Sequence, residues 1–214
     1  MTIDRAKQAH LWVRDEHDWY VEPYECSLAL FDHVTFSGSI WDPACGIGRI
    51  VKSALLSGLD CFGSDIIARS STCSIECDFF DSRKILPYEN IISNPPFGRA
   101  EEFVLRSLSL VPVGGHVAMI LPLVWMAGFS SKRDWLPRSP LQTVLPISPR
   151  PSMPPGAVIA AGEKPGNGTK DFAWFVWKKG TSDTPRIDFL HTKPYAHAAR
   201  ILEREERCER KQVA

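Results

Sequence analysis

Short apolar runs alternate with segments of helical periodicity along the middle of the chain. The apolar runs predict strands at 39–41, 61–65, 74–80, 90–93, 116–121, 141–147 and 172–177. Apolar residues recur at helical spacing in other segments, which predicts helices at 26–31, 49–56 and 100–111. This alternation is typical of an α/β fold with a mostly parallel sheet, in which we expect the last two strands to pair antiparallel across a long connection.

Three segments fall outside this pattern. Residues 123–140 and 148–170 are predicted to be irregular, and the second contains five prolines and four glycines. Long loops in a compact domain often carry function, so we expect both on the substrate side. The charged stretch 195–211 predicts a helix whose charges lie on a solvated face.

Length and composition indicate one soluble domain. The chain has 214 residues, of which 44% are hydrophobic and 23% charged. No linker divides it, so we expect a single domain over 1–214, with 1–17 and 195–214 peripheral and no separate target-recognition domain. No apolar run reaches the roughly 18 residues of a membrane span, and no secretory signal is visible. We therefore expect a cytoplasmic protein that does not enter membranes.

Charge and cysteine content argue against strong nonspecific nucleic-acid binding and against a metal site. The net charge is zero, whereas a strong nonspecific nucleic-acid binder is usually basic. A local basic region remains at 130–150, where Lys132, Arg133 and Arg150 are candidates for phosphate contacts. The six cysteines are scattered and lack the spacing of a zinc site, so we expect reduced thiols and no metal.

The first candidate site follows the first predicted strand, where residues 42–48 read DPACGIG. Ligands of open parallel sheets bind beyond the carboxyl ends of the strands, and this turn lies there. Gly46 and Gly48 let the backbone pass close under a ligand. A carboxylate about 20 residues after such a turn commonly takes ribose hydroxyls in dinucleotide folds, and Asp65 has that offset.

The second candidate site is the sequence Asn94-Pro95-Pro96-Phe97, directly after an apolar strand. The Asn94 side-chain carbonyl and the Pro95 backbone carbonyl can accept hydrogen bonds from one planar amino group. The two prolines fix that backbone in advance, which leaves little reorganisation during a reaction. Phe97 offers an aromatic face to the ring that carries the amino group. These residues predict chemistry on an exocyclic nitrogen.

Together the two motifs resemble those of class I S-adenosylmethionine-dependent DNA N6-adenine methyltransferases of the small phage and prophage type. The resemblance covers about residues 18–190 and includes 148–156 and 166–177. It implies a Rossmann-like methyltransferase fold of seven strands, with helices on both faces. S-adenosylmethionine is the implied cofactor, and Asp42, Ala44 and Gly46 are expected to line its methionine part.

The resemblance also assigns roles on either side of the turn. Asp65 is expected at the ribose hydroxyls, and Asp78 with Phe79 at the adenine ring of the cofactor. Related enzymes carry a Tyr-x-Thr-Pro segment that closes over the cofactor, and here residues 20–23 read YVEP. Tyr20 and Pro23 are therefore expected to pack at the cofactor. Glutamate replaces threonine at position 22, which leaves its role open.

Adenine in DNA is the substrate that the resemblance implies, in a flipped-out or single-stranded state. Lys132, Arg133 and Arg150 would contact the phosphates. A chain without a recognition domain is expected to have modest intrinsic specificity, or help from a second copy or a specificity partner. Three alternatives remain: methylation of RNA, methylation of a protein glutamine, and a cofactor-binding subunit without catalytic activity.

Overall fold

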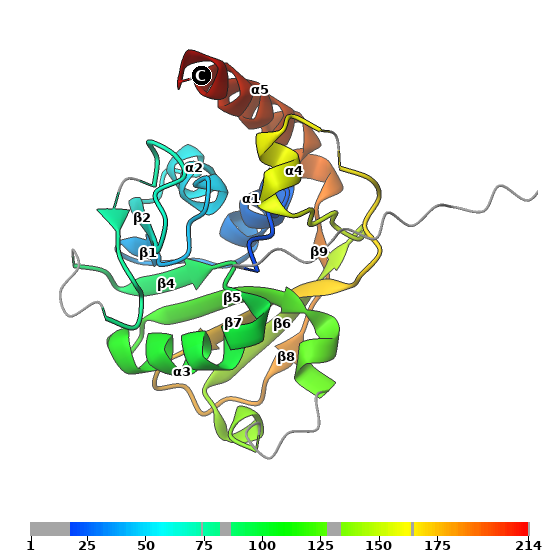
Figure 1. Cartoon of the computed structure of the whole chain (residues 1–214). Coiled ribbons are helices and arrows are strands. Elements are labelled where there is room, and N and C mark those ends of the chain that lie inside the picture. The colour runs from blue at the N-terminus through cyan, green and yellow to red at the C-terminus, as the bar shows by residue number, and fades with distance from the viewer. Residues whose placement is uncertain (1–17, 74, 82–86, 128–133, 164, 214) are drawn as a thin grey trace, which may run out of the picture.

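The computed structural model describes residues 18–73, 75–81, 87–127, 134–163 and 165–213 (Figure 1). The α-helices are α1 (Tyr24–His33), α2 (Arg49–Leu56), α3 (Ala100–Leu110), α4 (Gly156–Ala160) and α5 (Ala196–Val213). The strands are β1 (Ile40–Asp42), β2 (Cys61–Asp65), β3 (Ile75–Glu76), β4 (Asn90–Ser93), β5 (His116–Pro122), β6 (Leu141–Ser148), β7 (Phe172–Lys178), β8 (Arg186–Ile187) and β9 (Leu190–His191). Short 3-10 turns occupy Phe97–Arg99, Leu123–Ala127, Leu136–Arg138 and Lys193–Tyr195.

One mixed sheet forms the centre of the molecule. Its order is β3-β2-β1-β4-β5-β7-β6-β8, and β9 pairs with β6. The strands from β3 to β5 run parallel, whereas β7 lies antiparallel between β5 and β6. The predicted mostly parallel α/β sheet and its antiparallel last pair are confirmed.

Both faces of the sheet are covered, as the strand sequences require. Along β5, Val117, Met119 and Leu121 belong to the core under α3, whereas Ala118 and Ile120 belong to the core shared with α1 and α2. Figure 1 shows α3 on one side of the sheet and α1 and α2 on the other. A strand buried on both faces reads as a continuous apolar run, which is why β5 was recognisable from its sequence.

Two differences from the predicted elements concern the edges of the sheet. Within the described residues 75–80, the expected strand is limited to Ile75–Glu76, because the Asp78 carboxylate accepts the Phe80 N–H at 2.9 Å and turns the chain. The short strands β8 and β9 carried no clear apolar alternation and were not predicted. Among the described helices, none has the length and apolar character needed to cross a bilayer.

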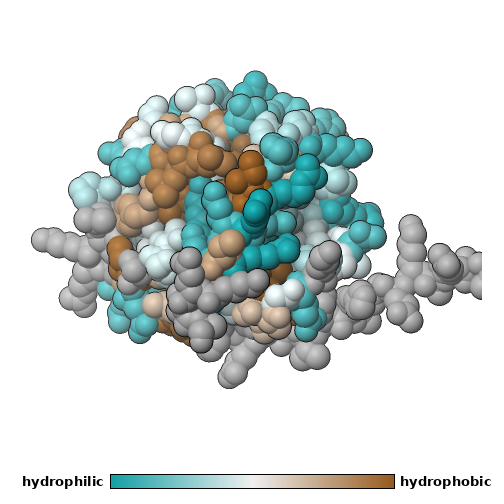
Figure 2. All heavy atoms as spheres, turned by 90° about the horizontal axis from the view of Figure 1, so that it is seen from above, coloured by the Kyte–Doolittle hydropathy of each residue, from teal (hydrophilic) through white to brown (hydrophobic). Residues whose placement is uncertain are grey.

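The C-terminal helix is present as expected, but one of its charges is buried. Glu206 of α5 is 3% exposed and pairs with Arg49 of α2, with 2.9 Å between Oε2 and Nε. The Tyr24 hydroxyl of α1 donates to the same carboxylate at 2.9 Å. The expectation that the helix carries only solvated charges is therefore wrong at this position. Figure 2 looks onto the molecule from above the view of Figure 1. The visible face is mainly hydrophilic, and its hydrophobic residues gather in one arc.

Candidate active site

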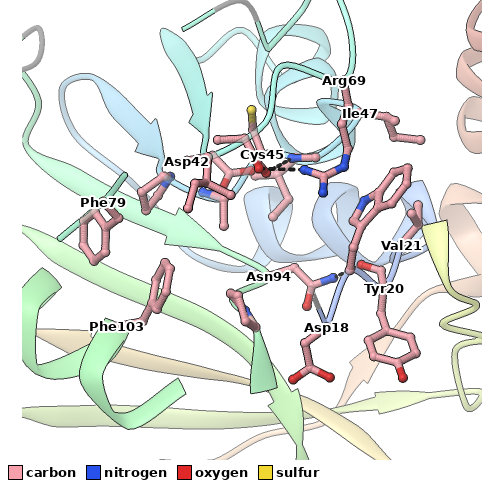
Figure 3. A pocket seen from close by; sticks show the side chains of 18 of the residues that line it. Asp18, Tyr20, Val21, Asp42, Cys45, Ile47, Arg69, Phe79, Asn94 and Phe103 are labelled. Atoms are coloured by element: carbon pink, nitrogen blue, oxygen red, sulfur yellow. Dashed lines mark hydrogen bonds and ion pairs between the residues drawn. The ribbon is translucent and has the colours of Figure 1, made fainter. Parts of the chain in front are cut away.

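A cavity opens beyond the carboxyl ends of β1, β2 and β4, where the polar motifs were predicted to meet. It holds about 790 Å³ of space, including space open to solvent. Asp42, Asp65, Asp78 and Asn94 all line it. Figure 3 shows Asp42 and Asn94 directed into it from neighbouring parts of the wall. The fold therefore brings together both motifs that the sequence singled out.

The turn after β1 needs glycine because another chain segment packs against it. Gly46 has a φ of +52°, and a Cβ there would lie 2.9 Å from Trp19 Nε1. Gly48 has a φ of +82° and is the N-cap of α2. Ala44 and Gly46 line the cavity, whereas Gly48 does not and packs against Thr72 instead. Gly48 shapes the turn rather than the cavity wall.

Asp42 is buried in the cavity wall, with one partner on β4 and one in the turn after β1. Its Oδ1 accepts the Ser93 hydroxyl at 2.7 Å and the Ala44 N–H at 3.2 Å. Burial raises the pKa of Asp42 well above its usual value, against the hydrogen bond from Ser93. Asp42 thus joins the cofactor turn to the strand that carries Asn94. Ser93 was not singled out in the sequence, where a small hydroxyl at a strand end gives no distinctive signal.

Asp65 at the end of β2 holds the turn in place. Its Oδ2 accepts the Gly46 N–H at 2.8 Å, and its Oδ1 accepts the Ile67 N–H at 3.1 Å. Arg69 forms an ion pair with Oδ1 at 2.7 Å, and its guanidinium lies 4.4 Å from the centre of the Trp19 ring. Asp65 therefore stands at the predicted offset and lines the cavity, with Arg69 as a partner that the sequence did not indicate.

A disulfide between Cys45 and Cys73 links the cofactor turn to the segment before β3. The two Cα atoms are 6.2 Å apart, within the range that a disulfide spans. The expectation of reduced thiols is therefore wrong for these two residues. Spacing did not reveal the pair because its members lie 28 residues apart in the sequence. Within the described residues, no group of three potential ligands could hold a metal ion.

Asp78 and Phe79 reach the cavity from the turn after β3. The Phe79 ring stacks on Phe103 of α3 at a centroid distance of 4.8 Å and meets the edge of Trp41 at 5.3 Å. Figure 3 shows Phe79 and Phe103 side by side at one end of the cavity. This end is thus aromatic, with one carboxylate beside it. An aromatic wall beside an acceptor is suited to a planar heterocycle with an amino group.

Asn94 has a single amide orientation, set by two acceptors. Its Nδ2 donates to the Tyr20 carbonyl at 2.8 Å and to Glu22 Oε2 at 2.8 Å. The Tyr20 carbonyl and the ionised Glu22 carboxylate have no proton to give, so the amide nitrogen must face them and the oxygen must face away. Among the described residues, no donor bonds to Asn94 Oδ1. The cavity wall therefore presents a free side-chain acceptor.

The residues after Asn94 differ in what they expose. Pro96 lines the cavity, and its carbonyl accepts the Arg99 N–H at 2.9 Å. Pro95 is buried, and among the described residues no donor bonds to its carbonyl. The Phe97 ring stacks on Tyr20, with centroids 5.7 Å apart and planes 13° from parallel. In this structure Tyr20 covers a face of the ring that was expected to receive the substrate.

Other predicted site residues lie away from the cavity. Pro23 is the N-cap of α1 and lines a neighbouring hollow. Arg150 is exposed and paired with Asp171, with 2.5 Å between Nε and Oδ1, and it borders the same hollow as Pro23. Lys132 and Arg133 lie outside the described residues, so their role as phosphate contacts stays a prediction.

The segment 18–22 contributes more to the site than its sequence indicated. Trp19 covers the turn at Gly46, and its carbonyl accepts the Gly156 N–H at 2.9 Å. Glu22 is 6% exposed, and burial raises its pKa above the usual value. Arg49 donates to the backbone carbonyl of Glu22 at 3.0 Å. The resemblance of residues 20–23 to a Tyr-x-Thr-Pro segment pointed here, but it left the role of Glu22 open.

Comparison with known proteins identifies the fold. No family model and no curated protein matches the sequence. Among solved structures, a candidate class I S-adenosylmethionine-dependent methyltransferase from Listeria monocytogenes matches at 14% identity and a TM-score of 0.50, covering 84% of this chain and 68% of that one. The modification subunit of a candidate type I restriction enzyme from Vibrio vulnificus YJ016 matches at 15% identity and a TM-score of 0.50, over 80% of this chain and 46% of that one.

A third match is the type IIG restriction endonuclease BpuSI, at 15% identity and a TM-score of 0.52. It covers 75% of this chain and 25% of the endonuclease. This chain thus spans less than half the length of the Vibrio modification subunit and a quarter of BpuSI. These likenesses show that the chain has the class I methyltransferase fold.

Proposed function

We propose that this chain binds S-adenosylmethionine and transfers its methyl group to the exocyclic N6 of adenine in DNA. The observation that carries the proposal is Asn94, whose amide nitrogen is fully used and whose oxygen faces the cavity as a free acceptor. Asn94 and the turn at Asp42–Gly46 line the same cavity, so a ligand on that turn and an amino group at Asn94 would share one space.

The residues present fit the proposed cofactor. The aromatic end at Phe79 and Phe103, with Asp78 beside it, suits the adenine ring and its amino group. Asp65 lies at the cavity wall for ribose hydroxyls. Asp42, Ala44 and Gly46 line the same cavity, where the methionine part is expected. When bound, the cofactor supplies an electrophilic methyl group on a sulfonium.

The protein residues then have to activate and place the nucleophile. The lone pair of an exocyclic amine is delocalised into its ring, which makes the nitrogen a weak nucleophile. Asn94 Oδ1 and the Pro95 carbonyl can accept its two N–H groups and so localise the lone pair. Both acceptors are fixed before the substrate arrives, so little reorganisation accompanies the reaction. Holding the nitrogen in line with the methyl group supplies the remaining gain.

DNA is favoured over the other substrates by the likeness to restriction–modification proteins. The target adenine would enter flipped out or from a single strand, because the cavity is too narrow for a duplex. Sequence recognition would come from the segments 123–140 and 148–170, from a second copy or from a specificity partner.

The test is transfer of labelled methyl groups from S-adenosylmethionine to separate pools of DNA, RNA and protein. We expect label in DNA, recovered as N6-methyladenine after digestion to nucleosides. Label in RNA or in protein glutamine would identify a different substrate for the same methyl transfer. Label in no pool, with the cofactor still bound in calorimetry, would identify a non-catalytic subunit.

A further inference from the structure

We propose that Glu22 is a positioning residue that holds the Asn94 amide so that its oxygen faces the substrate amino group. The inference rests on the proposed function and extends it to a residue whose role the sequence left open. Its basis is the hydrogen bond of 2.8 Å from Asn94 Nδ2 to Glu22 Oε2.

The contact decides which end of the amide faces the cavity. An asparagine side chain can rotate by half a turn and exchange its nitrogen for its oxygen at little steric cost. In the exchanged orientation the oxygen would face the Glu22 carboxylate and the Tyr20 carbonyl, and three acceptors would meet without a proton. The nitrogen would then point at the substrate N–H groups. Glu22 therefore disfavours the orientation that cannot catalyse.

Charge makes Glu22 more effective than a neutral acceptor. A hydrogen bond to a carboxylate is about twice as strong as one between neutral groups. It also polarises the amide, which makes Asn94 Oδ1 a better acceptor, because linked hydrogen bonds strengthen one another at low dielectric. The buried position of Glu22, at 6% exposure, preserves this effect from screening by water.

Glu22 is itself fixed by the layer beneath it. Arg49 donates to its backbone carbonyl at 3.0 Å, and Arg49 is held by Glu206 at 2.9 Å. Val21 donates its N–H to the Pro154 carbonyl at 3.0 Å, which ties down the residue just before it. The carboxylate thus projects from a backbone held on both sides.

The burial of Glu22 distinguishes positioning from a structural role. Burial raises the pKa of this carboxyl group, which means that keeping it ionised costs folding stability. A side chain that served only the fold would be replaced without loss by the neutral and isosteric glutamine. Glu22→Gln is therefore expected to leave the melting temperature unchanged or to raise it, while catalysis falls.

The first experiment measures kcat, KM and cofactor affinity on a DNA substrate for Glu22→Gln and Glu22→Leu. We expect kcat to fall about tenfold for Glu22→Gln, which keeps a neutral acceptor, and about 10²-fold or more for Glu22→Leu. Cofactor affinity should stay within about threefold in calorimetry for Glu22→Gln. Glu25→Gln is the matched control, because Glu25 lies on α1 outside this cavity, and its kcat should equal that of the wild type.

The second experiment exchanges the hydrogen-bond donor and acceptor between positions 22 and 94. Asn94→Asp alone places two carboxylates in contact, so activity should be low and restricted to acidic pH. Adding Glu22→Gln supplies an amide at position 22 that can donate to the new carboxylate. The double variant should regain at least about tenfold in kcat over Asn94→Asp alone, as expected for two coupled positions.

The outcomes separate this inference from the proposed function. Wild-type protein that transfers no methyl group to DNA, RNA or protein overturns the proposed methyl transfer, and the catalytic role of Glu22 with it. Active wild type with an unchanged kcat in both Glu22 variants overturns only the positioning role. Loss of cofactor affinity with normal kcat at saturation would make Glu22 a cofactor ligand and would also overturn it. A double variant no better than Asn94→Asp would show that the two side chains are not coupled.

Discussion

The two halves of the cavity use their polar groups in opposite ways. In the cofactor half, formed by residues 42–48 and Asp65, the carboxylates are already bonded to their own protein. Asp42 accepts from Ser93, and Asp65 accepts from Gly46 and Arg69. In the acceptor half, formed by residues 94–97 and 20–22, the bonds instead leave one oxygen free.

The hydrogen bonds of the two halves therefore have different tasks: those of one half fix the shape of the site, and those of the other prepare the reaction. The hydrogen bonds of the cofactor half fix a turn, so changes there should alter ligand affinity and folding more than the rate of the reaction. Those of the acceptor half fix the direction of an acceptor, so changes there should alter the rate with little effect on cofactor affinity. Arg49 lies between them, because α2 begins at the cofactor turn and the Arg49 side chain bonds the backbone of Glu22.

Removing the free acceptor should have the largest effect. For Asn94→Ala we expect kcat to fall about 10³-fold, at the upper end for loss of one preorganised group. Cofactor affinity should stay within about twofold, because the turn at 42–48 is untouched. Single-turnover methylation and calorimetry measure the two quantities. Turnover close to that of the wild type would remove Asn94 from the reaction.

The ion pair beneath both halves should dominate folding stability. Glu206→Gln leaves the Arg49 charge buried without its counter-ion, which should cost about 3 kcal/mol of unfolding free energy at pH 7. Burial alone would raise the pKa of Glu206, but hydrogen bonds and charge from Arg49 lower it below the usual 4.5.

The pH dependence of that stability has a definite sign. A carboxyl group with a lowered folded pKa stabilises the fold above its unfolded pKa and loses that contribution as pH falls through the folded value. The difference between wild type and Glu206→Gln should therefore shrink as pH falls below the usual carboxyl value of 4.5. Denaturant unfolding at several pH values measures it. A difference that grows in acid would contradict the ion pair.

The disulfide should stabilise the fold and also hold the turn of the cofactor half. Closing a loop of 28 residues is expected to contribute about 3 kcal/mol to folding. Cys73→Ser should therefore lower the melting temperature and weaken cofactor binding, since Cys45 lies in the turn. Cys208→Ser is the control, because that thiol is free and exposed. Equal melting temperatures for both variants under oxidising conditions would argue against the bond.

Asp65→Asn tests the cofactor half without removing bulk. The amide still accepts from Gly46 or Ile67 but loses its charge toward Arg69. We expect cofactor affinity to fall about tenfold, because one charge-assisted hydrogen bond from a ribose hydroxyl to this carboxylate would be lost. The kcat at saturating cofactor should change little. Unchanged affinity in calorimetry would exclude Asp65 from the cofactor site.

The features that could be predicted from the sequence are those set by residues close together in the chain. The strands around β5, the glycine turn and the motif at 94–97 follow from local periodicity and from two short motifs. Contacts between distant residues were not predictable, because nothing local encodes them: Glu22 meets Asn94 across 72 residues, and Arg49 meets Glu206 across 157. All the charges of α5 were predicted to lie on a solvated face, because one buried glutamate does not alter the charge pattern of a helix whose other charged residues are mostly exposed.

The smallest effect should come from Arg150, outside both halves. Its pair with Asp171 is exposed, so Arg150→Ala should leave the melting temperature unchanged. If Arg150 contacts a phosphate, the variant should bind DNA about threefold more weakly at moderate salt, with the slope of log affinity against log salt reduced by about one. Asp171→Asn is the matched control: it frees the same arginine and should tighten binding. An unchanged salt slope would reduce Arg150 to a surface ion pair and leave 123–140 as the segment to search for phosphate contacts.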